Sequence, residues 1–133
     1  MVVDNEIFQL VPKVPEAVAV VTVDGEDPAD IFNKRTAVYI NFGKQRRNST
    51  IEYPFDIIFK SGDNKFKALD LNTECGCTKS SSFRTKPDGN MELLLKYNSN
   101  RIGIQDKGDF RKGIKLNTDK GSINFVLLIS EQK

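Results

Sequence analysis

Apolar and polar residues alternate in short runs along most of this chain, with a period of two residues rather than the 3.6 of an α-helix. The clearest run is Phe55-Asp56-Ile57-Ile58-Phe59-Lys60, in which Phe55, Ile57 and Phe59 would share one face of a strand. Glycine, asparagine, aspartate and proline separate the runs. This pattern predicts an all-β protein, an antiparallel sandwich of two sheets.

Seven runs enriched in β-branched and aromatic residues are expected to be strands. They are Ala17–Val23, Ala37–Phe42, Glu52–Lys60, Lys65–Asn72, Met91–Tyr97, Arg111–Thr118 and Ser122–Ile129. Tight hairpin turns are expected at Asp63-Asn64 and Lys120-Gly121, because such turns favour asparagine and glycine. The alternation within the runs places twelve residues on inner faces: Phe42, Phe55, Ile57, Phe59, Leu69, Leu71, Leu93, Leu95, Ile114, Leu116, Phe125 and Leu127.

Residues 1–36 differ from the rest and are interpreted as an N-terminal arm on a sandwich formed by residues 37–133. Pro12 and Pro15 would interrupt a continuous strand, so Ile7–Val11 is expected to be a separate extended piece. The apolar run Ala17–Val23 needs a sheet edge to pair with, because an unpaired apolar strand invites aggregation. The sequence leaves open whether that edge belongs to the chain itself or to a neighbour.

The motif Glu74-Cys75-Gly76-Cys77-Thr78 follows the strand-like run Phe66–Leu71 and precedes a turn ending in Lys86-Pro87-Asp88-Gly89. Together with the flanking runs Tyr39–Gly43 and Leu93–Asn98, it resembles a family of immunoglobulin-like β-sandwich domains of unknown function. That family is abundant in Bacteroidetes and marked by a Cys-Gly-Cys-Thr motif. The resemblance covers roughly residues 38–133. It implies an immunoglobulin-like fold in which Cys75, Gly76, Cys77 and Thr78 form a structural motif, and it implies no established chemistry.

The two cysteines are expected to be reduced thiols with at least one of them buried, and no metal or cofactor is expected. Residues i and i+2 of one strand point to opposite faces, so a disulfide between Cys75 and Cys77 would be strained. The chain contains no histidine, which excludes Ser-His-Asp catalysis, Cys-His catalysis and histidine-ligated zinc. These observations favour a protein that is not an enzyme.

The net charge of +2 hides an asymmetry along the chain. Residues 1–33 contain seven acidic residues and one lysine, a net charge of −6, whereas residues 34–133 contain 19 basic and 11 acidic residues, a net charge of +8. Two readings stay open: the acidic segment pairs head to tail with another copy or a neighbouring protein, or it folds back on its own body.

Basic residues cluster at Lys34-Arg35, at Lys44-Gln45-Arg46-Arg47 and between Lys107 and Lys115. Such clusters are compatible with nucleic-acid binding, but acidic residues interrupt them and the aromatic residues fall mostly at predicted core positions, so direct nucleic-acid contact is not expected. We expect instead a protein interface formed by the arm and the basic body. Its candidate residues are Phe8, Leu10, Val18, Val20, Asp24, Glu26, Asp27, Lys44, Arg46 and Arg47.

The function expected from the sequence is a non-enzymatic structural role in a large assembly. The specific expectation is an auxiliary (decoration) capsid protein, or another virion protein, of a tailed phage, which docks on the major capsid protein and stabilises the shell. The N-terminus lacks the basic start and apolar run of a secretory signal, and no apolar stretch is long enough to span a membrane. We therefore expect synthesis in the host cytoplasm and location in the virion. The alternative is an envelope-associated immunoglobulin-like module that binds protein or glycan.

Overall fold

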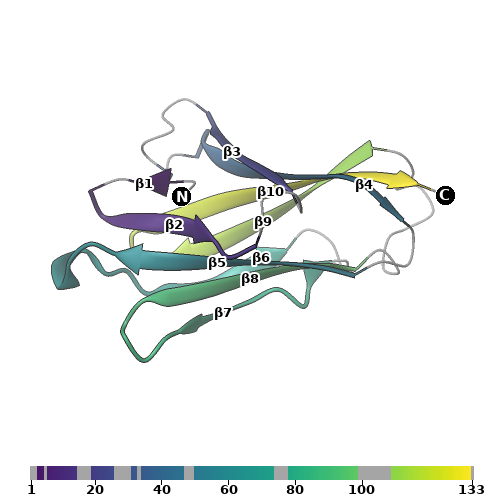
Figure 1. The fold of residues 1–133 in the computed structure, drawn as a ribbon. Helices are drawn as coiled ribbons and strands as arrows, with labels where there is room; N and C mark the ends of the chain where they lie inside the picture. Colours follow the sequence, from purple (N-terminus) through teal and green to yellow (C-terminus); the bar gives the residue numbers. More distant parts are fainter. Residues whose placement is uncertain are drawn as a thin grey trace.

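Two five-stranded sheets pack face to face (Figure 1). The computed structural model describes the chain except for residues 1–2, 5, 15–18, 26–30, 33, 47–49, 74–77, 99–108 and 133, and except for the side chains of residues 45, 46, 64, 109, 110, 131 and 132. The described part contains strands, turns and one short 3₁₀ helix, η1 (Gly62–Asn64). The prediction of an all-β sandwich is confirmed.

The first sheet, called sheet I, has the strand order β1-β2-β5-β8-β7, and all of its neighbouring strands are antiparallel. Its strands are β1 (Val3–Asp4), β2 (Phe8–Pro12), β5 (Thr50–Phe59), β8 (Met91–Asn98) and β7 (Ser82–Thr85). Strand β7 lies in a segment that was read from the sequence as a turn. It forms a hairpin with β8 around Pro87-Asp88-Gly89, where the amide of Lys86 donates to the carbonyl of Asn90 at 2.7 Å.

The second sheet, called sheet II, has the order β3-β4-β10-β9-β6. Its strands are β3 (Val20–Asp24), β4 (Ala37–Arg46), β10 (Gly121–Gln132), β9 (Asp109–Thr118) and β6 (Ala68–Thr73). Strands β9 and β10 form a tight hairpin as expected, but its two-residue turn is Asp119-Lys120 rather than Lys120-Gly121, because Gly121 already pairs with Thr118. Strands β4 and β10 run parallel, so sheet II is mixed rather than wholly antiparallel.

The strand order is that of an immunoglobulin-like sandwich. In that fold seven consecutive strands, A to G, divide into a sheet ordered A-B-E-D and a sheet ordered C-F-G. Here β2, β5, β8 and β7 occupy the A-B-E-D order, and β6, β9 and β10 occupy the C-F-G order. Strand β1 extends sheet I beside β2, and the β3–β4 hairpin extends sheet II beside β10. The predicted fold class is confirmed by this order.

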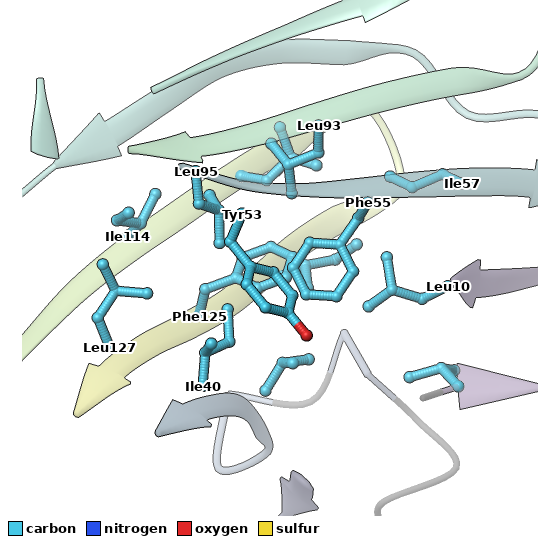
Figure 2. Packing of buried hydrophobic residues seen from close by; sticks show 14 of the residues in the cluster. Leu10, Ile40, Tyr53, Phe55, Ile57, Leu93, Leu95, Ile114, Phe125 and Leu127 are labelled. Carbon is cyan, nitrogen blue, oxygen red and sulfur yellow. The ribbon is translucent and has the colours of Figure 1, made fainter. Parts of the chain in front are cut away.

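The core lies between the two sheets and follows from the alternation of apolar residues (Figure 2). In β8, Met91, Leu93, Leu95 and Tyr97 are buried, whereas the residues between them are partly exposed. Phe55 faces Leu93 across the β5–β8 pair. Burial of each large apolar side chain stabilises the fold by about 1.5–3 kcal/mol relative to exposure.

The described part of residues 1–36 supplies strands to both sheets. Strand β2 pairs with β5 from Phe8↔Phe59 to Pro12↔Phe55, and β3 pairs with β4. The prediction that Ile7–Val11 forms a separate extended piece ending near Pro12 is confirmed. The edge with which the Val20–Asp24 strand pairs is the chain's own, which answers the question that the sequence left open.

Two local expectations are wrong. Leu69 was placed on an inner face, but its side chain is 58% exposed, because the β6–β9 register shifts between Ala68 and Asp70 and leaves Leu69 as the extra residue of a bulge. The expected hairpin at Asp63-Asn64 is instead η1, a connection from β5 in sheet I to β6 in sheet II. The other eleven predicted core residues are buried or packed against the core.

Candidate functional site on the outer face of sheet II

Strand β9 presents basic residues on the outer face of sheet II because it alternates strictly. Ile114 and Leu116 point inward and are buried, so Arg111, Gly113 and Lys115 point outward. Arg111 and Lys115 are exposed. Gly113 lies between them and has no side chain, which leaves a gap between the two cations on this face.

A bulge in β4 brings Lys44 to the same face. Val38, Ile40 and Phe42 are buried, so strict alternation would have turned Lys44 inward. The β4–β10 register instead passes from Asn41↔Leu128 to Gly43↔Ile129, which makes Phe42 the extra residue. Gly43 has φ +64°, and its amide donates to Oδ1 of Asn41 at 2.9 Å. Lys44 then pairs with Ser130 and is exposed on the outer face.

Two adjoining hollows lie along β10 on the outer face of sheet II. The larger has a volume of about 770 Å³ and the smaller about 510 Å³, and Arg111 lines both. The larger hollow is bounded by the turn residues Lys34 and Arg35 and by Lys115. Lys44 lines the smaller hollow. Ala37 and Gly113 are among the residues that line the larger hollow, and their small size leaves room for it.

The charged residues in the described lining of these hollows all have one sign. The described lining includes five basic residues, Lys34, Arg35, Lys44, Arg111 and Lys115, and no acidic one. The guanidinium carbon of Arg111 lies 5.7 Å from the centroid of the Tyr39 ring, a cation–π contact that holds the arginine over the sheet. Lys34, Lys44 and Lys115 make no ion pair with any other residue that the structure describes. A lining of this kind attracts negative charge.

The outer face of sheet I is also charged, but its charges are paired within the chain. Asp56 and Glu92 stand directly opposite each other on β5 and β8, an arrangement that is repulsive by itself. Lys13 offsets the repulsion, with Nζ 2.8 Å from Oε2 of Glu92 and 3.8 Å from Oδ1 of Asp56. Arg84 binds Glu92 at 3.0 Å, and Lys86 binds Asp56 at 3.2 Å.

These ion pairs keep the Glu92 carboxyl ionised. Hydrogen bonds from Lys13 and Arg84 lower its pKa from the ordinary value of 4.5 to about 2. The same contact with Glu92 raises the pKa of the Lys13 ammonium. General acid catalysis by a carboxyl group at neutral pH requires a raised pKa. Glu92 therefore belongs to a structural ion-pair cluster and is not suited to general acid catalysis at neutral pH.

The structure separates the candidate interface residues into three groups. Phe8 and Leu10 are fully buried in the chain's own core, so their expected place at an interface is wrong. Val20, 63% exposed, and the exposed Asp24 lie on the edge strand β3, and Lys44 lines the smaller hollow. Arg46 lies in β4, but its side chain is outside the described part, and the following residues lie wholly outside it: Val18, Glu26, Asp27 and Arg47.

The Cys-Gly-Cys-Thr motif is described only at its last residue. Cys75, Gly76 and Cys77 lie outside the described residues, so the expectation of reduced and partly buried thiols stays a prediction. Thr78 is fully buried at the start of the turn before β7. Among the described residues, His, Cys, Asp and Glu form no group of three or more that could hold a metal ion.

The sequence reasoning named the basic clusters but missed that three of them meet on one face. Tyr39 and Arg111 were not among the candidate interface residues, although the alternation of β9 was a usable signal, since it separates Arg111 and Lys115 from Ile114. The contribution of Lys44 had no such signal, because it depends on a bulge.

Comparisons with known proteins add little to this picture. No family model matches the sequence, and no curated protein matches it. Among solved structures, the M1 domain from titin is similar with a TM-score of 0.42 and 14% identity, covering 71% of this chain and 90% of that domain. The strand order given above, rather than this remote likeness, defines the fold class. No helix in the described part of the chain is both long and apolar enough to cross a membrane.

Proposed function

We propose that this protein is a non-enzymatic docking module of a large assembly and that it binds an acidic surface of a neighbouring subunit through the outer face of sheet II. In the form expected from the sequence, the assembly is a tailed-phage virion and the neighbour is its major capsid protein. Docking between shell subunits would stabilise the shell, because a ligand that binds only the assembled state shifts the equilibrium toward it.

The choice of docking face rests on one observation. Five basic residues line the two adjoining hollows, and their described lining contains no acidic residue. The charges of sheet I are neutralised within the chain, so sheet I offers a partner little net field. Converging cations on sheet II repel one another and are relieved by an anionic partner. Electrostatic docking of this kind favours fast and specific association.

The non-enzymatic part of the proposal rests on the chemistry that the hollows offer. Their lining supplies ammonium and guanidinium groups, the amides of Asn72 and Asn124 and the hydroxyl of Ser122. A hydroxyl nucleophile such as Ser122 would need a general base beside it, usually histidine or a carboxylate. The sequence has no histidine, and the described lining has no carboxylate.

Co-expression with the major capsid protein encoded nearest to this gene tests the proposal. Assembled shells are isolated on a density gradient, and the amount of this protein in the shell fraction is measured. The double variant Arg111→Glu/Lys115→Glu should be lost from the shells, whereas Lys67→Glu/Lys79→Glu, which makes the same charge change at exposed lysines outside both hollows, should co-sediment normally. Raising the salt concentration should release the unmodified protein as the Debye length falls from about 10 Å at 0.1 M.

Two results would contradict the proposal. If the unmodified protein does not co-sediment with shells but fractionates with host envelopes, the alternative of an envelope-associated binding module takes its place. If the Arg111→Glu/Lys115→Glu variant co-sediments as well as the unmodified protein, docking does not use sheet II.

A further inference from the structure

We infer that the larger hollow binds an extended segment of the partner protein, and that this segment carries two acidic side chains four residues apart with a small apolar side chain midway between them. The inference rests on the proposed function and specifies its partner: an acidic β-strand-like segment, recognised by the spacing of Arg111 and Lys115 across Gly113.

The spacing of the two cations sets the spacing of the acidic residues. Arg111, Gly113 and Lys115 are successive outward positions of β9. Their rise of 3.2–3.4 Å per residue separates the Arg111 and Lys115 Cα atoms by about 13 Å. An extended segment that lies along the sheet has the same rise, so its residues i and i+4 match the backbone positions of Arg111 and Lys115, while the Arg111 guanidinium leans towards Tyr39.

Val126 and Tyr39 lie beside Gly113 on the next two strands, β10 and β4, which defines the middle of the segment. Val126 lies opposite Gly113 across the β9–β10 pair, and Tyr39 lies opposite Val126 across the β4–β10 pair. Gly113 contributes no side chain above this surface. A small β-branched residue at i+2 would fill the space and bury apolar area against Val126.

The contact between Tyr39 and Arg111 argues against a nucleic acid as the ligand. Proteins that bind single-stranded nucleic acids stack bases on exposed aromatic rings. The guanidinium of Arg111 lies over the Tyr39 ring, so that face of the ring is not free to accept a base. The other aromatic side chain that lines the larger hollow at the surface, Phe32, packs edge-on against Phe8 and Phe66. Carboxylates can bind the basic residues that line the hollow without stacking on an aromatic ring.

Nuclear magnetic resonance titration of the ¹⁵N-labelled full chain at low salt tests the spacing. The probe is a capped five-residue peptide, glutamate–threonine–valine–threonine–glutamate, which presents both glutamates and the valine on one face. Its control, threonine–glutamate–valine–glutamate–threonine, has the same composition and charge but places the glutamates two residues apart. We expect amide signals of residues 111–115 and 124–128 to shift with the probe, and the control to bind more weakly.

Protein variants complete the test. Arg111→Glu should weaken binding of the probe about tenfold or more, because it adds a repulsive contact and removes an attractive one. Arg111→Lys should have a smaller effect, since it keeps the charge but loses the planar group over Tyr39. Lys67→Glu should leave binding unchanged, because Lys67 lines neither hollow.

Several results would overturn the inference. Equal binding of the two peptides would show that spacing is not read, and shifts confined to sheet I would place the site elsewhere. Tighter binding of an oligothymidylate of equal charge would assign the hollow to nucleic acid. Each of these results is distinguishable from failure of the proposed function, because the shells can still lose the Arg111→Glu/Lys115→Glu variant when neither peptide binds.

Discussion

The outer faces of the two sheets are both charged, but the charges of sheet I are paired with each other, whereas the described charges around the hollows of sheet II are all positive. On sheet I, two adjacent carboxylates, Asp56 and Glu92, are held by Lys13, Arg84 and Lys86. On sheet II, basic residues from the turn before β4, from β4 and from β9 converge without an acidic residue among the described lining of the hollows.

If the proposed docking face is right, the difference separates stability from binding within one fold. Exposed ion pairs typically contribute little to stability, so the sheet I cluster acts mainly to cancel the repulsion between its two carboxylates. Lys34, Lys44 and Lys115 on sheet II make no ion pair within the described residues, so an anionic partner would relieve their mutual repulsion. Both faces rest on one shared core.

We expect the largest effect on stability from deleting the N-terminal segment, which supplies strands to both sheets. Deletion of residues 1–36 takes away β1, β2 and β3, including the buried Phe8 and Leu10. We expect the remaining chain to lose cooperative unfolding, as measured by circular dichroism during heating. A stable folded product would restore the interpretation of this segment as a detachable arm.

A single substitution also tests whether the N-terminal segment is part of the core. Phe8→Ala should lower the free energy of unfolding by about 3–5 kcal/mol, because it leaves a cavity beside Phe32 and Phe66. Val20→Ala is the matched control from the same segment, and its 63% exposed side chain should contribute little. Chemical denaturation measures both variants. Equal losses would contradict the burial of Phe8.

The bulge that turns Lys44 outward is tested by Gly43→Ala. The position has φ +64°, which costs an L-residue about 1–2 kcal/mol, although no atom lies within 4 Å of the added Cβ. Gly62→Ala is the control, since its Cβ also meets nothing within 4 Å and its φ lies outside the left-handed region. We expect only Gly43→Ala to destabilise the protein and to weaken docking, both measured on the same preparations.

Low pH should destabilise the protein by weakening the ion pairs of sheet I. The pKa of Glu92 is lowered on folding to about 2 from 4.5. A group with a lowered folded pKa adds stability that is complete above its unfolded pKa and is lost as the pH falls through its folded pKa. The melting temperature should therefore drop between pH 4.5 and pH 2, and Glu92→Gln should reduce that slope.

Part of the acid slope should persist in the Glu92→Gln variant, because Asp4, bound by Lys60, and Asp88, bound by the Asn90 amide, also have lowered pKa values. Thermal unfolding at a series of pH values measures the difference. An unchanged slope in the variant would show that the ion pairs of Glu92 with Lys13 and Arg84 are not formed in solution.

The smallest effect is expected at Leu69. This side chain is 58% exposed on β6 and lines neither hollow. Leu69→Ser should change the free energy of unfolding by no more than about 0.5 kcal/mol and leave docking intact. Loss of docking in this variant would extend the docking face to the β6 edge of sheet II.

Much of the fold was predictable because alternation is a local property. The runs at Met91–Tyr97 and Arg111–Thr118 each have one apolar face, and that face must be buried, so their strands and inward residues follow directly. The short strand β7 was missed because Ser82–Thr85 carries a single large apolar residue, Phe83, and depends on pairing with β8. Leu69 was misplaced because a bulge reverses alternation without changing composition.

The sequence by itself determined the fold class, most of the core and the presence of basic clusters, since hydrophobic period and charge are properties of neighbouring residues. Only the tertiary structure decided where those clusters meet. Lys34, Lys44 and Arg111 are distant along the chain and come together because β4 pairs in parallel with β10 while β9 pairs with the other edge of β10. In sheet I, the β2–β5 pairing placed Phe8 in the core, and the β5–β8 and β7–β8 pairings brought the opposite charges together. Cross-strand register is fixed by the packing of the whole sandwich.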